Sequence, residues 1–361
     1  MNSSFFNGFV NGILPWYLNN QRDLPWRNTR DPYAIWLSEV ILQQTRVQQG
    51  LSYYHAFLSA YPDVLSLAAA SEDEVFKIWQ GLGYYSRARN LMRTAQCIVQ
   101  EMDGQFPQTF EGLLKLPGVG PYTAAAIASF AFDVPKAAVD GNVLRWTSRL
   151  FGSDAPIDLP ATKAMVQTEL DSWIGQTSPH LFNQAAMEFG AMLCSPVPKC
   201  GECPLNEQCI AFREQKVKEL PVKSKKVKVE EKHVYAFFFH NAKGNFAVEK
   251  LPEKGIWAGL YSLPMWMSDE PLNQADVLKR IQKQGWVTAD VCDLPSPYLV
   301  THLLTHRRLK VHIFCILLKN MPKNASIFER WISVEEARHL GFPKVFERYL
   351  KTQIPKYAGL I

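Results

Sequence analysis

The sequence predicts a multidomain protein in which a helical domain is followed by an α+β domain. The chain has 361 residues, and a domain usually contains roughly 100–200 residues. Up to about residue 193, apolar residues recur at helical spacing. After residue 232 the pattern changes to short runs of β-branched and aromatic residues, which are typical of strands.

The N-terminal half contains several segments whose apolar residues would form one face of a helix. Clusters of Gly, Pro and Asp, which favour turns, separate them. Ser71 followed by Glu74 has the spacing of a capping box, which marks a helix start. The predicted helices are 31–47, 71–82, 122–132 and 161–174, with a short one near 206–215.

These changes of pattern set the expected domain boundaries. We expect a helical domain over residues 1–215, a linker over 216–232 and an α+β domain over 233–361. The linker is rich in Lys and lacks a core-forming pattern. In the last domain, strands are expected at 233–240, 245–250, 259–264 and 309–318, and helices at 274–285 and 333–340.

Composition narrows the possible classes of protein. Lys plus Arg number 39 against 34 for Asp plus Glu, a net charge of +5, which permits a polyanionic partner without proving one. No run approaches the ~20 apolar residues of a membrane-spanning helix, and the first residues lack the pattern of a secretory signal. We therefore expect no membrane partner and a cytoplasmic location.

Four of the seven cysteines form a tight cluster, Cys194, Cys200, Cys203 and Cys209. An odd total with one cluster indicates a metal site in a reducing compartment rather than a disulfide framework. Four thiolates can bind zinc or an iron–sulfur cluster, and the spacing alone does not decide between them. Four unrelated buried cysteines are the alternative.

The pentapeptide from Leu116 to Gly120 predicts a tight turn before an apolar helix. Gly118 and Gly120 allow backbone N–H groups to approach a phosphate closely, and the next helix presents its N-terminus to the same anion. This arrangement, a helix–hairpin–helix, binds a nucleic-acid backbone without selecting a base sequence. An ordinary Gly-rich turn is the alternative.

An acidic residue follows the hairpin at position 140. The run Asp140-Gly141-Asn142 marks a turn or a helix start, and taken alone Asp140 is equally an N-cap. The hairpin, this Asp and the cysteine cluster are much more specific together than separately.

The combined motifs resemble the helix–hairpin–helix DNA glycosylase superfamily and, in detail, the MutY-type adenine DNA glycosylases. The resemblance is dense over residues 20–213 and looser through the C-terminal domain. It implies an all-α helix–hairpin–helix glycosylase domain with an iron–sulfur cluster loop, followed by an α+β Nudix-like domain. The segments that carry it are 23–27, 38–47, 81–90, 116–127, 139–143 and 182–194, with the cysteine cluster.

The resemblance also implies a function and a cofactor. The protein is expected to be a monofunctional glycosylase of base excision repair that hydrolyses the N-glycosidic bond of adenine opposite 8-oxoguanine or guanine. Its partner would be double-stranded DNA in the nucleoid, and we expect a monomer; the sequence does not identify its repair-protein partners. One 4Fe-4S cluster would bind to the four clustered cysteines, although five residues separate Cys194 from Cys200 where the family more often has six.

Cleavage of a purine N-glycosidic bond needs a proton for the base and a negative charge beside the sugar cation. By resemblance, Glu39 is the general acid and Asp140 stabilises or traps the sugar, so their environments must separate their pKa values. Tyr122 matches a position that supports the Asp140 carboxylate, and Asn142 lies beside that carboxylate to orient it. A Schiff base needs a primary amine, so Tyr122 predicts that the strand is not cut through an imine.

Base recognition is assigned by resemblance as well. An enzyme that attacks a paired base must extrude it, and Gln44 and Tyr84 are expected to fill the vacated stack and touch the opposite base. Trp26, Arg27 and Gln184 match the adenine pocket. Contacts to the DNA backbone are expected from Gly118, Gly120, Arg87 and Arg89.

The C-terminal domain lacks the acidic helix that binds magnesium in Nudix hydrolases, so we expect recognition rather than pyrophosphate hydrolysis. Related proteins check for 8-oxoguanine with a Phe-Ser-His loop, which Leu304-Thr305-His306 matches here. Thr305 keeps the hydroxyl and His306 the imidazole, whereas Leu304 replaces the aromatic ring.

Three other functions compete with this prediction. They are a thymine-directed or other mismatch glycosylase on the same frame, a non-catalytic DNA-binding protein with a structural cluster, and a Nudix hydrolase. Tyr122 and Gln184 disfavour the first, the presence of both Glu39 and Asp140 disfavours the second, and the missing acidic helix disfavours the third.

Overall fold

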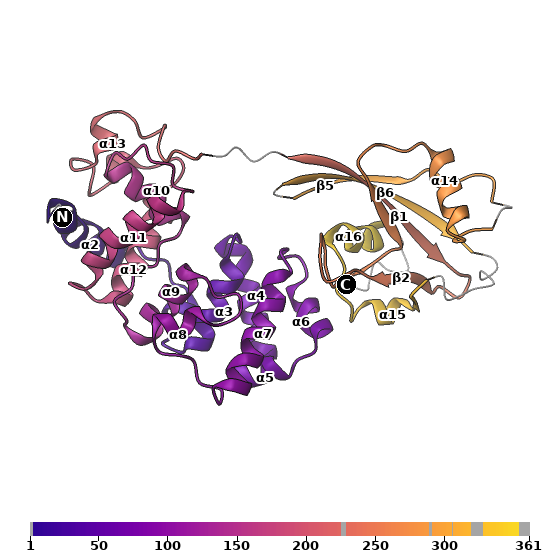
Figure 1. Cartoon of the computed structure of the whole chain (residues 1–361), viewed down its shortest axis with the longest axis horizontal. Coiled ribbons are helices and arrows are strands. Elements are labelled where there is room, and N and C mark those ends of the chain that lie inside the picture. Colours follow the sequence, from indigo (N-terminus) through magenta and orange to yellow (C-terminus); the bar gives the residue numbers. More distant parts are fainter. Residues whose placement is uncertain (1–2, 225–228, 289–290, 305, 319–327, 354–361) are drawn as a thin grey trace. The chain divides into compact units, whose positions relative to one another are not determined.

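The computed structural model describes residues 3–224, 229–288, 291–304, 306–318 and 328–353 (Figure 1). Contacts divide the chain into two compact units. The first unit comprises Met1–Ala69 and Asn90–Lys226, and the second comprises Ala70–Arg89 and Val227–Ile361. The first is helical and the second contains a mixed sheet, which confirms the predicted order of a helical part and an α+β part.

The second unit includes a helical segment, residues 70–89, that the sequence analysis placed in the N-terminal domain. Within this unit, Lys250 Nζ lies 3.6 Å from Glu72 Oε2 and 3.3 Å from Asp73 Oδ1. These ion pairs join the segment 70–89 to strand β2 (Phe246–Lys250). The junction after Lys226 falls inside the predicted linker. The boundaries 1–215, 216–232 and 233–361 remain a prediction.

Short helices joined by tight turns build the first unit. The prediction of one helix over 31–47 is wrong, because two helices with a turn between them occupy that range. The elements are α1 (Ser3–Gly8), η1 (Phe9–Ile13), α2 (Leu14–Asn20), η2 (Pro25–Arg27), α3 (Pro32–Leu42), α4 (Val47–Ala60), α5 (Val64–Ala69), most of α7 (Ser86–Glu101), α8 (Phe110–Leu114), α9 (Pro121–Phe132), α10 (Gly141–Leu150), α11 (Pro160–Ile174), α12 (Pro179–Glu188), η3 (Phe189–Leu193), η4 (Cys200–Glu202) and α13 (Ile210–Arg213).

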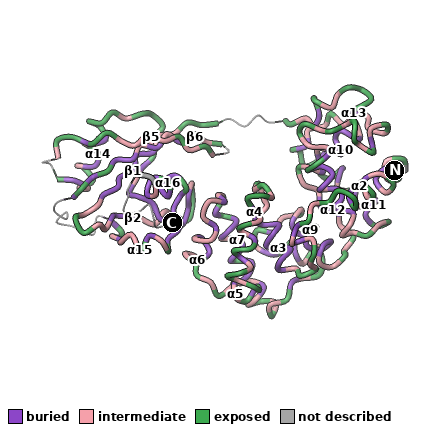
Figure 2. The backbone as a smooth tube through the Cα atoms, turned by 180° about the vertical axis from the view of Figure 1, so that it is seen from behind, coloured by how far each residue is buried: buried purple, intermediate pink, exposed green. Residues whose placement is uncertain are grey.

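Two of these helices form the centre of the unit. Residues 33–41 of α3 and 123–130 of α9 are all buried, and the two helices pack against each other (Figure 2). A helix that is apolar on all sides belongs in a core. Glu39 is therefore a carboxyl group inside the core, which is costly unless it has a partner.

The predicted helix–hairpin–helix is present between α8 and α9. Gly118 has φ +72°, a left-handed conformation, and Thr94 Oγ1 donates a hydrogen bond to the Pro117 carbonyl. Gly120 is the N-cap of α9, with Pro121 at the first helical position, where proline favours helix initiation.

The second unit is built on one mixed sheet with the strand order β3-β2-β1-β6-β5, in which β4 also pairs with β1 and β7 with β2. β1 and β6 are parallel, and the other pairs are antiparallel. The elements are α6 (Glu72–Trp79), β1 (Glu230–His240), β2 (Phe246–Lys250), β3 (Tyr261–Ser262), β4 (Met265–Ser268), α14 (Gln274–Lys283), β5 (Tyr298–Leu303), β6 (Arg307–Leu317), β7 (Arg330–Ile332), α15 (Val334–Ala337) and α16 (Lys344–Gln353).

Helices cover both faces of this sheet because side chains along β1 alternate between them. Phe237 and Phe239 pack in one cluster with Val277 of α14. Phe238 points the other way, and its ring lies 6.1 Å from that of Tyr349 in α16. The elements β4, β5, β7 and α16 were not predicted; β4 and β7 are only four and three residues long, and α16 is rich in charged residues.

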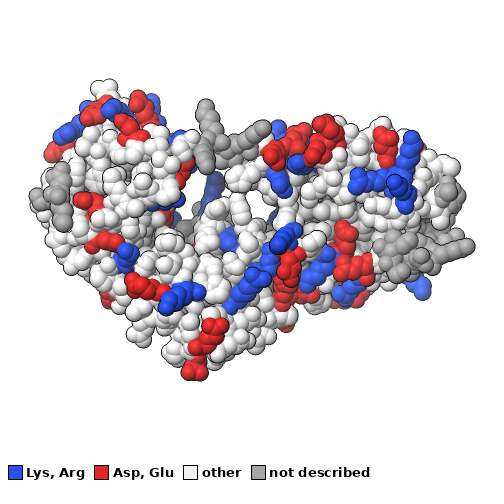
Figure 3. Space-filling model, in the orientation of Figure 1, with Lys and Arg blue, Asp and Glu red and all other residues white. Residues whose placement is uncertain are grey.

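Charged side chains are mixed in sign on the surface. On the face drawn in Figure 3, Lys and Arg are interspersed with Asp and Glu on both units. This distribution agrees with the mild net charge of +5. No described helix is long and apolar enough to cross a membrane.

The hairpin glycine gives a direct test of this geometry. In Gly118→Ala, the alanine would have to adopt the left-handed backbone conformation of Gly118, and its Cβ would lie 2.5 Å from Asn90 Cβ. We expect the free energy of unfolding to fall by about 1–3 kcal/mol, measured by urea and thermal unfolding of the full chain. The matched control is Gly175→Ala, whose Cβ meets no atom within 4 Å; an equal loss in both variants would contradict the expectation.

Candidate active site

A pocket in the first unit brings together distant parts of the sequence. It encloses about 190 Å³, which is smaller than the roughly 300–1,000 Å³ of sites for drug-sized ligands, and so fits a group of one or two rings. Seven predicted site residues contribute to its lining: Trp26, Arg27, Glu39, Tyr122, Asp140, Asn142 and Gln184. The lining also includes residues that were not predicted, among them Arg22, Ser38, Met187 and Glu188.

Glu39 projects into this pocket from the core helix α3. It is 5% exposed, and the Tyr122 hydroxyl donates a hydrogen bond of 2.7 Å to its Oε2. Burial raises the pKa of Glu39 to about 7; the Tyr122 hydrogen bond opposes that shift, and the nearby Asp140 adds to it. The carboxyl group can therefore hold a proton near neutral pH, as a general acid must.

Tyr122 is predicted to support the Asp140 carboxylate, and in this structure its hydroxyl donates to Glu39 and lies 3.8 Å from Met187 Sδ. The support of Asp140 by Tyr122 stays a prediction. Burial and the nearby Glu39 raise the pKa of Tyr122 well above its usual value. The phenol thus remains a donor, and its partner is the acid.

Asp140 caps the N-terminus of α10. Its Oδ1 accepts a 2.7 Å hydrogen bond from Val143 N, and its Oδ2 accepts one of 2.7 Å from Asn142 Nδ2. Burial raises the pKa of Asp140, and these hydrogen bonds oppose the shift. A helix N-terminus also favours a negative charge. The ionised form thus has several donors here, whereas Glu39 has one hydroxyl.

The sequence predicts that the two environments separate the pKa values of Glu39 and Asp140. Burial raises the pKa of both carboxyl groups. The two carboxyl groups differ instead in the hydrogen bonds that stabilise the charged form.

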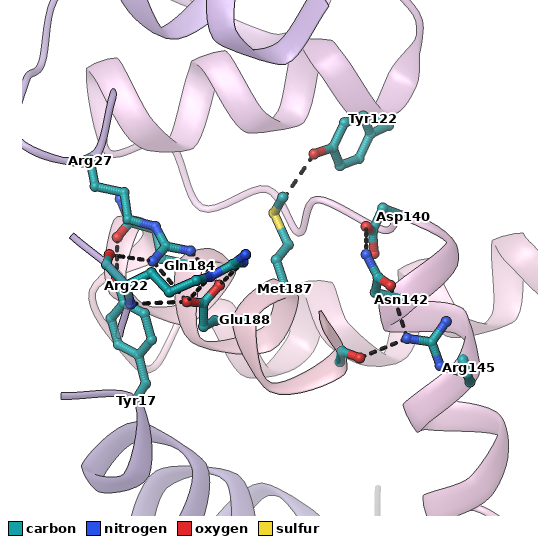
Figure 4. A network of polar contacts seen from close by, with 11 residues as sticks. Tyr17, Arg22, Arg27, Tyr122, Asp140, Asn142, Arg145, Gln184, Met187 and Glu188 are labelled. Carbon is teal, nitrogen blue, oxygen red and sulfur yellow. Dashed lines mark hydrogen bonds and ion pairs between the residues drawn. The ribbon is translucent and has the colours of Figure 1, made fainter. Parts of the chain in front are cut away.

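A chain of hydrogen bonds links Asp140 through Asn142 to Arg145 (Figure 4), and Arg145 in turn donates to the backbone of the first clustered cysteine, Cys194. Asn142 donates to Asp140, and its Oδ1 accepts from Arg145 Nη2 at 2.9 Å. Arg145 also donates from Nε to the Cys194 carbonyl at 2.9 Å and from Nη2 to the Gly190 carbonyl at 2.6 Å. Arg145 thereby fixes the end of η3 relative to the start of α10.

Glu188 forms a buried ion-pair cluster with two arginines on the pocket wall (Figure 4). Its Oε2 lies 2.6 Å from Arg22 Nη2 and 2.7 Å from Arg27 Nη2. Burial opposes ionisation, but the arginine hydrogen bonds lower the pKa of Glu188 to about 2. Glu188 lies four residues after Gln184 on α12 and hence on the same helix face, which is the sequence signal that could have found it.

Gln44 and Tyr84 share an unusual backbone conformation. Both are exposed and left-handed, with φ 57° and 48°. Such conformations in non-glycine residues often mark functional sites. Gln44 lies in the turn between α3 and α4 of the first unit, and Tyr84 belongs to the second unit.

The two arginines that were predicted to contact the DNA backbone form hydrogen bonds within the second unit, and their contact with DNA stays a prediction. Arg87 is buried, its guanidinium lies 5.0 Å from the Trp79 ring centroid, and its Nη2 donates to the Leu82 and Gly83 carbonyls at 3.2 and 3.3 Å. Arg89 Nη1 donates to the Ala258 carbonyl at 2.8 Å. Both guanidinium groups therefore donate hydrogen bonds to backbone carbonyls of the second unit.

The predicted opposite-base loop is described only in part. Thr305 lies outside the described residues. His306 is exposed between β5 and β6, and its carbonyl accepts a 3.0 Å hydrogen bond from Glu230 N.

The four clustered cysteines line one further pocket of the first unit, together with apolar side chains such as Leu193 and Phe212. Among the described residues, no group of three or more His, Cys, Asp or Glu side chains is placed to hold a single metal ion. In an iron–sulfur cluster each thiolate binds a different iron, so the ligands stand farther apart.

The donors around these thiols fit a negatively charged sulfur cluster. Leu205 N donates to Cys203 Sγ at 3.4 Å, and Arg149 Nη1 lies 3.5 Å from Cys194 Sγ. Burial raises the pKa of Cys203 to about 12, and the neighbouring cysteines add to the shift. Four such thiolates require a bound cationic centre.

Comparison with known proteins gives two family matches. Residues 37–176 match the HhH-GPD superfamily of base excision DNA repair proteins, and residues 234–352 match the NUDIX domain. The adenine DNA glycosylase of Buchnera aphidicola subsp. Schizaphis graminum is 32% identical over 352 residues, 94% of this chain and 96% of that protein. The human adenine DNA glycosylase is 31% identical, with 94% of this chain and 74% of that protein covered.

Solved structures show the same fold for the helical part. A thermostable thymine-DNA glycosylase matches with TM-score 0.55 and 29% identity, covering 59% of this chain and 98% of that one. A trapped endonuclease III–DNA covalent intermediate matches with TM-score 0.52 and 22% identity, covering 60% and 99%.

The titration of Glu39 tests the pocket electrostatics. The measurement is a pH titration by NMR of protein labelled with ¹³C-glutamate, in which the Glu39 carboxyl resonance is identified because it is absent from Glu39→Gln. We expect this carboxyl group to titrate near pH 7 rather than at its ordinary pKa of 4.5. Tyr122→Phe should move the midpoint to higher pH, because the lost hydrogen bond favours the charged form.

The matched control is Tyr33→Phe, which removes a buried hydroxyl bonded to the Tyr61 carbonyl at 2.7 Å. It should leave the Glu39 midpoint unchanged. An ordinary midpoint in the unmodified chain, or a downward shift in Tyr122→Phe, would contradict the assignment.

Proposed function

Because the chain belongs to the family of adenine DNA glycosylases, we propose that it removes adenine opposite 8-oxoguanine or guanine in double-stranded DNA. The resemblance stated from the sequence is confirmed. The protein is a DNA glycosylase of base excision repair that acts on N-glycosyl bonds. The identity of the opposite base, the cluster and the roles of individual residues belong to the proposal.

The observation that carries the mechanism is the presence of Glu39 and Asp140 in one pocket with unequal hydrogen-bond support. Glu39, protonated near neutral pH, gives its proton to the departing adenine. The ionised Asp140 stabilises the positive charge that develops on the sugar. Glu39, once deprotonated, accepts a proton from the attacking water.

Hydrolysis without strand cleavage is supported by the pocket lining. None of the described residues that line it is a lysine, and the position after the hairpin holds Tyr122. An imine with the sugar needs a primary amine. The product is therefore an abasic site in an intact strand.

The cysteine pocket is proposed to hold one 4Fe-4S cluster through Cys194, Cys200, Cys203 and Cys209. When bound, the cluster supplies four positions for thiolate ligation and so closes the loop between η3 and α13. Arg145 donates to the Cys194 carbonyl, so this loop and the Asp140 cap support each other.

The Nudix-like domain is proposed to recognise the opposite base, with Thr305 and His306 in the contact loop. Gln44 and Tyr84 would fill the space of the extruded adenine, and the hairpin glycines 118 and 120 would bind the backbone. We further propose a monomer located in the cytoplasm at the nucleoid. Excision of thymine is the second candidate, favoured by the similarity to the thymine-DNA glycosylase structure.

A cleavage assay on defined duplexes tests this function. Substrates carry adenine opposite 8-oxoguanine, adenine opposite guanine, or thymine opposite guanine. We expect strand scission for the two adenine substrates and only after hot alkali, because the enzyme leaves an uncut abasic site. Scission without alkali would refute the hydrolytic mechanism, and release of thymine alone would favour the second candidate.

Two variants serve as controls in the same assay. Glu39→Gln should slow single-turnover excision by about 10²–10⁴-fold, the usual contribution of general acid catalysis, while retaining duplex binding. Asp140→Asn should be severely impaired. Normal rates in either variant would remove that residue from the mechanism.

The cofactor is tested by its composition. Protein purified without oxygen should be brown and contain about four iron and four sulfide per chain. Cys203→Ser should lose iron and unfold at lower temperature, whereas Cys97→Ser, outside the cysteine pocket, should keep both. A colourless zinc protein would overturn the assignment.

A further inference from the structure

Gln184 lies on the pocket wall with both ends of its side-chain amide engaged. It is 6% exposed. Tyr17 of α2 donates its hydroxyl proton to Gln184 Oε1, and Gln184 Nε2 lies 2.8 Å from His180 Nε2, one turn earlier on α12. Tyr17 and His180 therefore hold the amide from opposite ends.

Tyr17 determines where the amide oxygen points. Its side chain is 1% exposed, and burial is the main cause that raises its pKa, so the phenol keeps its proton. Among the described residues, Gln184 Oε1 is the acceptor that the structure shows for this proton. A reversed amide would set an NH₂ group against Tyr17 and leave a buried hydroxyl proton without an acceptor, which is unfavourable.

His180 determines the other end. An amide nitrogen only donates, so His180 Nε2 accepts, which places the imidazole proton on Nδ1. Burial and the nearby Arg30 lower the pKa of His180, while Asp133 opposes them. The Phe130 ring packs edge-on against the imidazole at 6.2 Å. A neutral imidazole in this tautomer supports the same amide orientation as Tyr17.

We propose that Tyr17 and His180 are positioning residues that lock the Gln184 amide in one orientation and so make the pocket select a 6-amino purine over a 6-oxo purine. This inference rests on the proposed function. Adenine donates from its 6-amino group, whereas guanine and hypoxanthine present an acceptor at that position. A glutamine that can rotate freely satisfies either base by exchanging its oxygen and nitrogen. A locked amide satisfies one.

The lock uses residues that do not themselves need to touch the base. Gln184 keeps one lone pair on Oε1 and one hydrogen on Nε2 for a ligand. In the proposed arrangement Oε1 faces position 6 of the bound purine, so a 6-oxo group would meet an acceptor there and a 6-amino group would meet a partner. Selectivity then depends on the energy of reversing the amide, which Tyr17 and His180 provide.

Single-turnover excision of adenine and of hypoxanthine, each opposite 8-oxoguanine, tests the proposal. Hypoxanthine differs from adenine at the 6 position and at N1–H and lacks the bulk of a 2-amino group. In Tyr17→Phe we expect the adenine-to-hypoxanthine rate ratio to fall by about tenfold or more, with a similar fall in His180→Ala. An unchanged ratio in Tyr17→Phe, or equal losses for both bases, would overturn the lock.

The matched control is Tyr33→Phe, which removes another buried hydroxyl of the first unit without touching this pocket. It should keep the ratio of the unmodified enzyme. A fall of the same size in this variant would show a general loss of rigidity and overturn the specific role of Tyr17.

A double-mutant cycle separates orientation of Gln184 from other effects of Tyr17. In a Gln184→Ala background there is no amide to orient, so Tyr17→Phe should leave the ratio unchanged. A further fall would show that Tyr17 acts elsewhere, for instance through Arg27, whose guanidinium lies 5.7 Å from its ring centroid, and would refute the proposal. If the unmodified chain released no adenine, the proposed function itself would fail, which the cleavage assay reveals independently.

Discussion

The burial of one carboxyl group, Glu39, is the constraint on which the rest of the active site depends. Helices α3 and α9 are apolar on nearly every side and pack together, so a carboxyl group between them loses its water. That loss raises the pKa of Glu39 to about 7. The same packing that stabilises the fold thus produces a proton donor, and Tyr122 from α9 supplies its one hydroxyl partner.

Those parts of the site that depend on local chain geometry were predictable from sequence. Asp140 caps a helix because Asp-Gly-Asn favours a helix start, and the hairpin needs glycine where φ is +72°. The roles given to Glu39 and the cysteines came from resemblance. Position alone would have placed Glu39 at the surface, since a lone Glu in a helix is usually exposed.

Contacts between side chains distant in sequence were not predictable. The position of Tyr122 after the hairpin does not show that its hydroxyl donates to Glu39. Nor does the sequence show that the Arg87 guanidinium lies over the Trp79 ring and donates to nearby carbonyls. Glu188 and Tyr17 went unnoticed, since their contacts form only when α2 and the segment before α3 both meet α12.

The charges on the pocket wall explain how Glu39 keeps its proton beside an arginine. Arg27 lies near enough to Glu39 to lower its pKa, which would favour the ionised form and leave less of the carboxyl group protonated near neutral pH. Glu188 is ionised, with a pKa of about 2, and pairs with Arg27 and Arg22. The negative charge of Glu188 offsets the positive charge of Arg27. Burial remains the largest influence on the pKa of Glu39. The guanidinium group can then line the base pocket as a rigid donor without ionising the acid beside it.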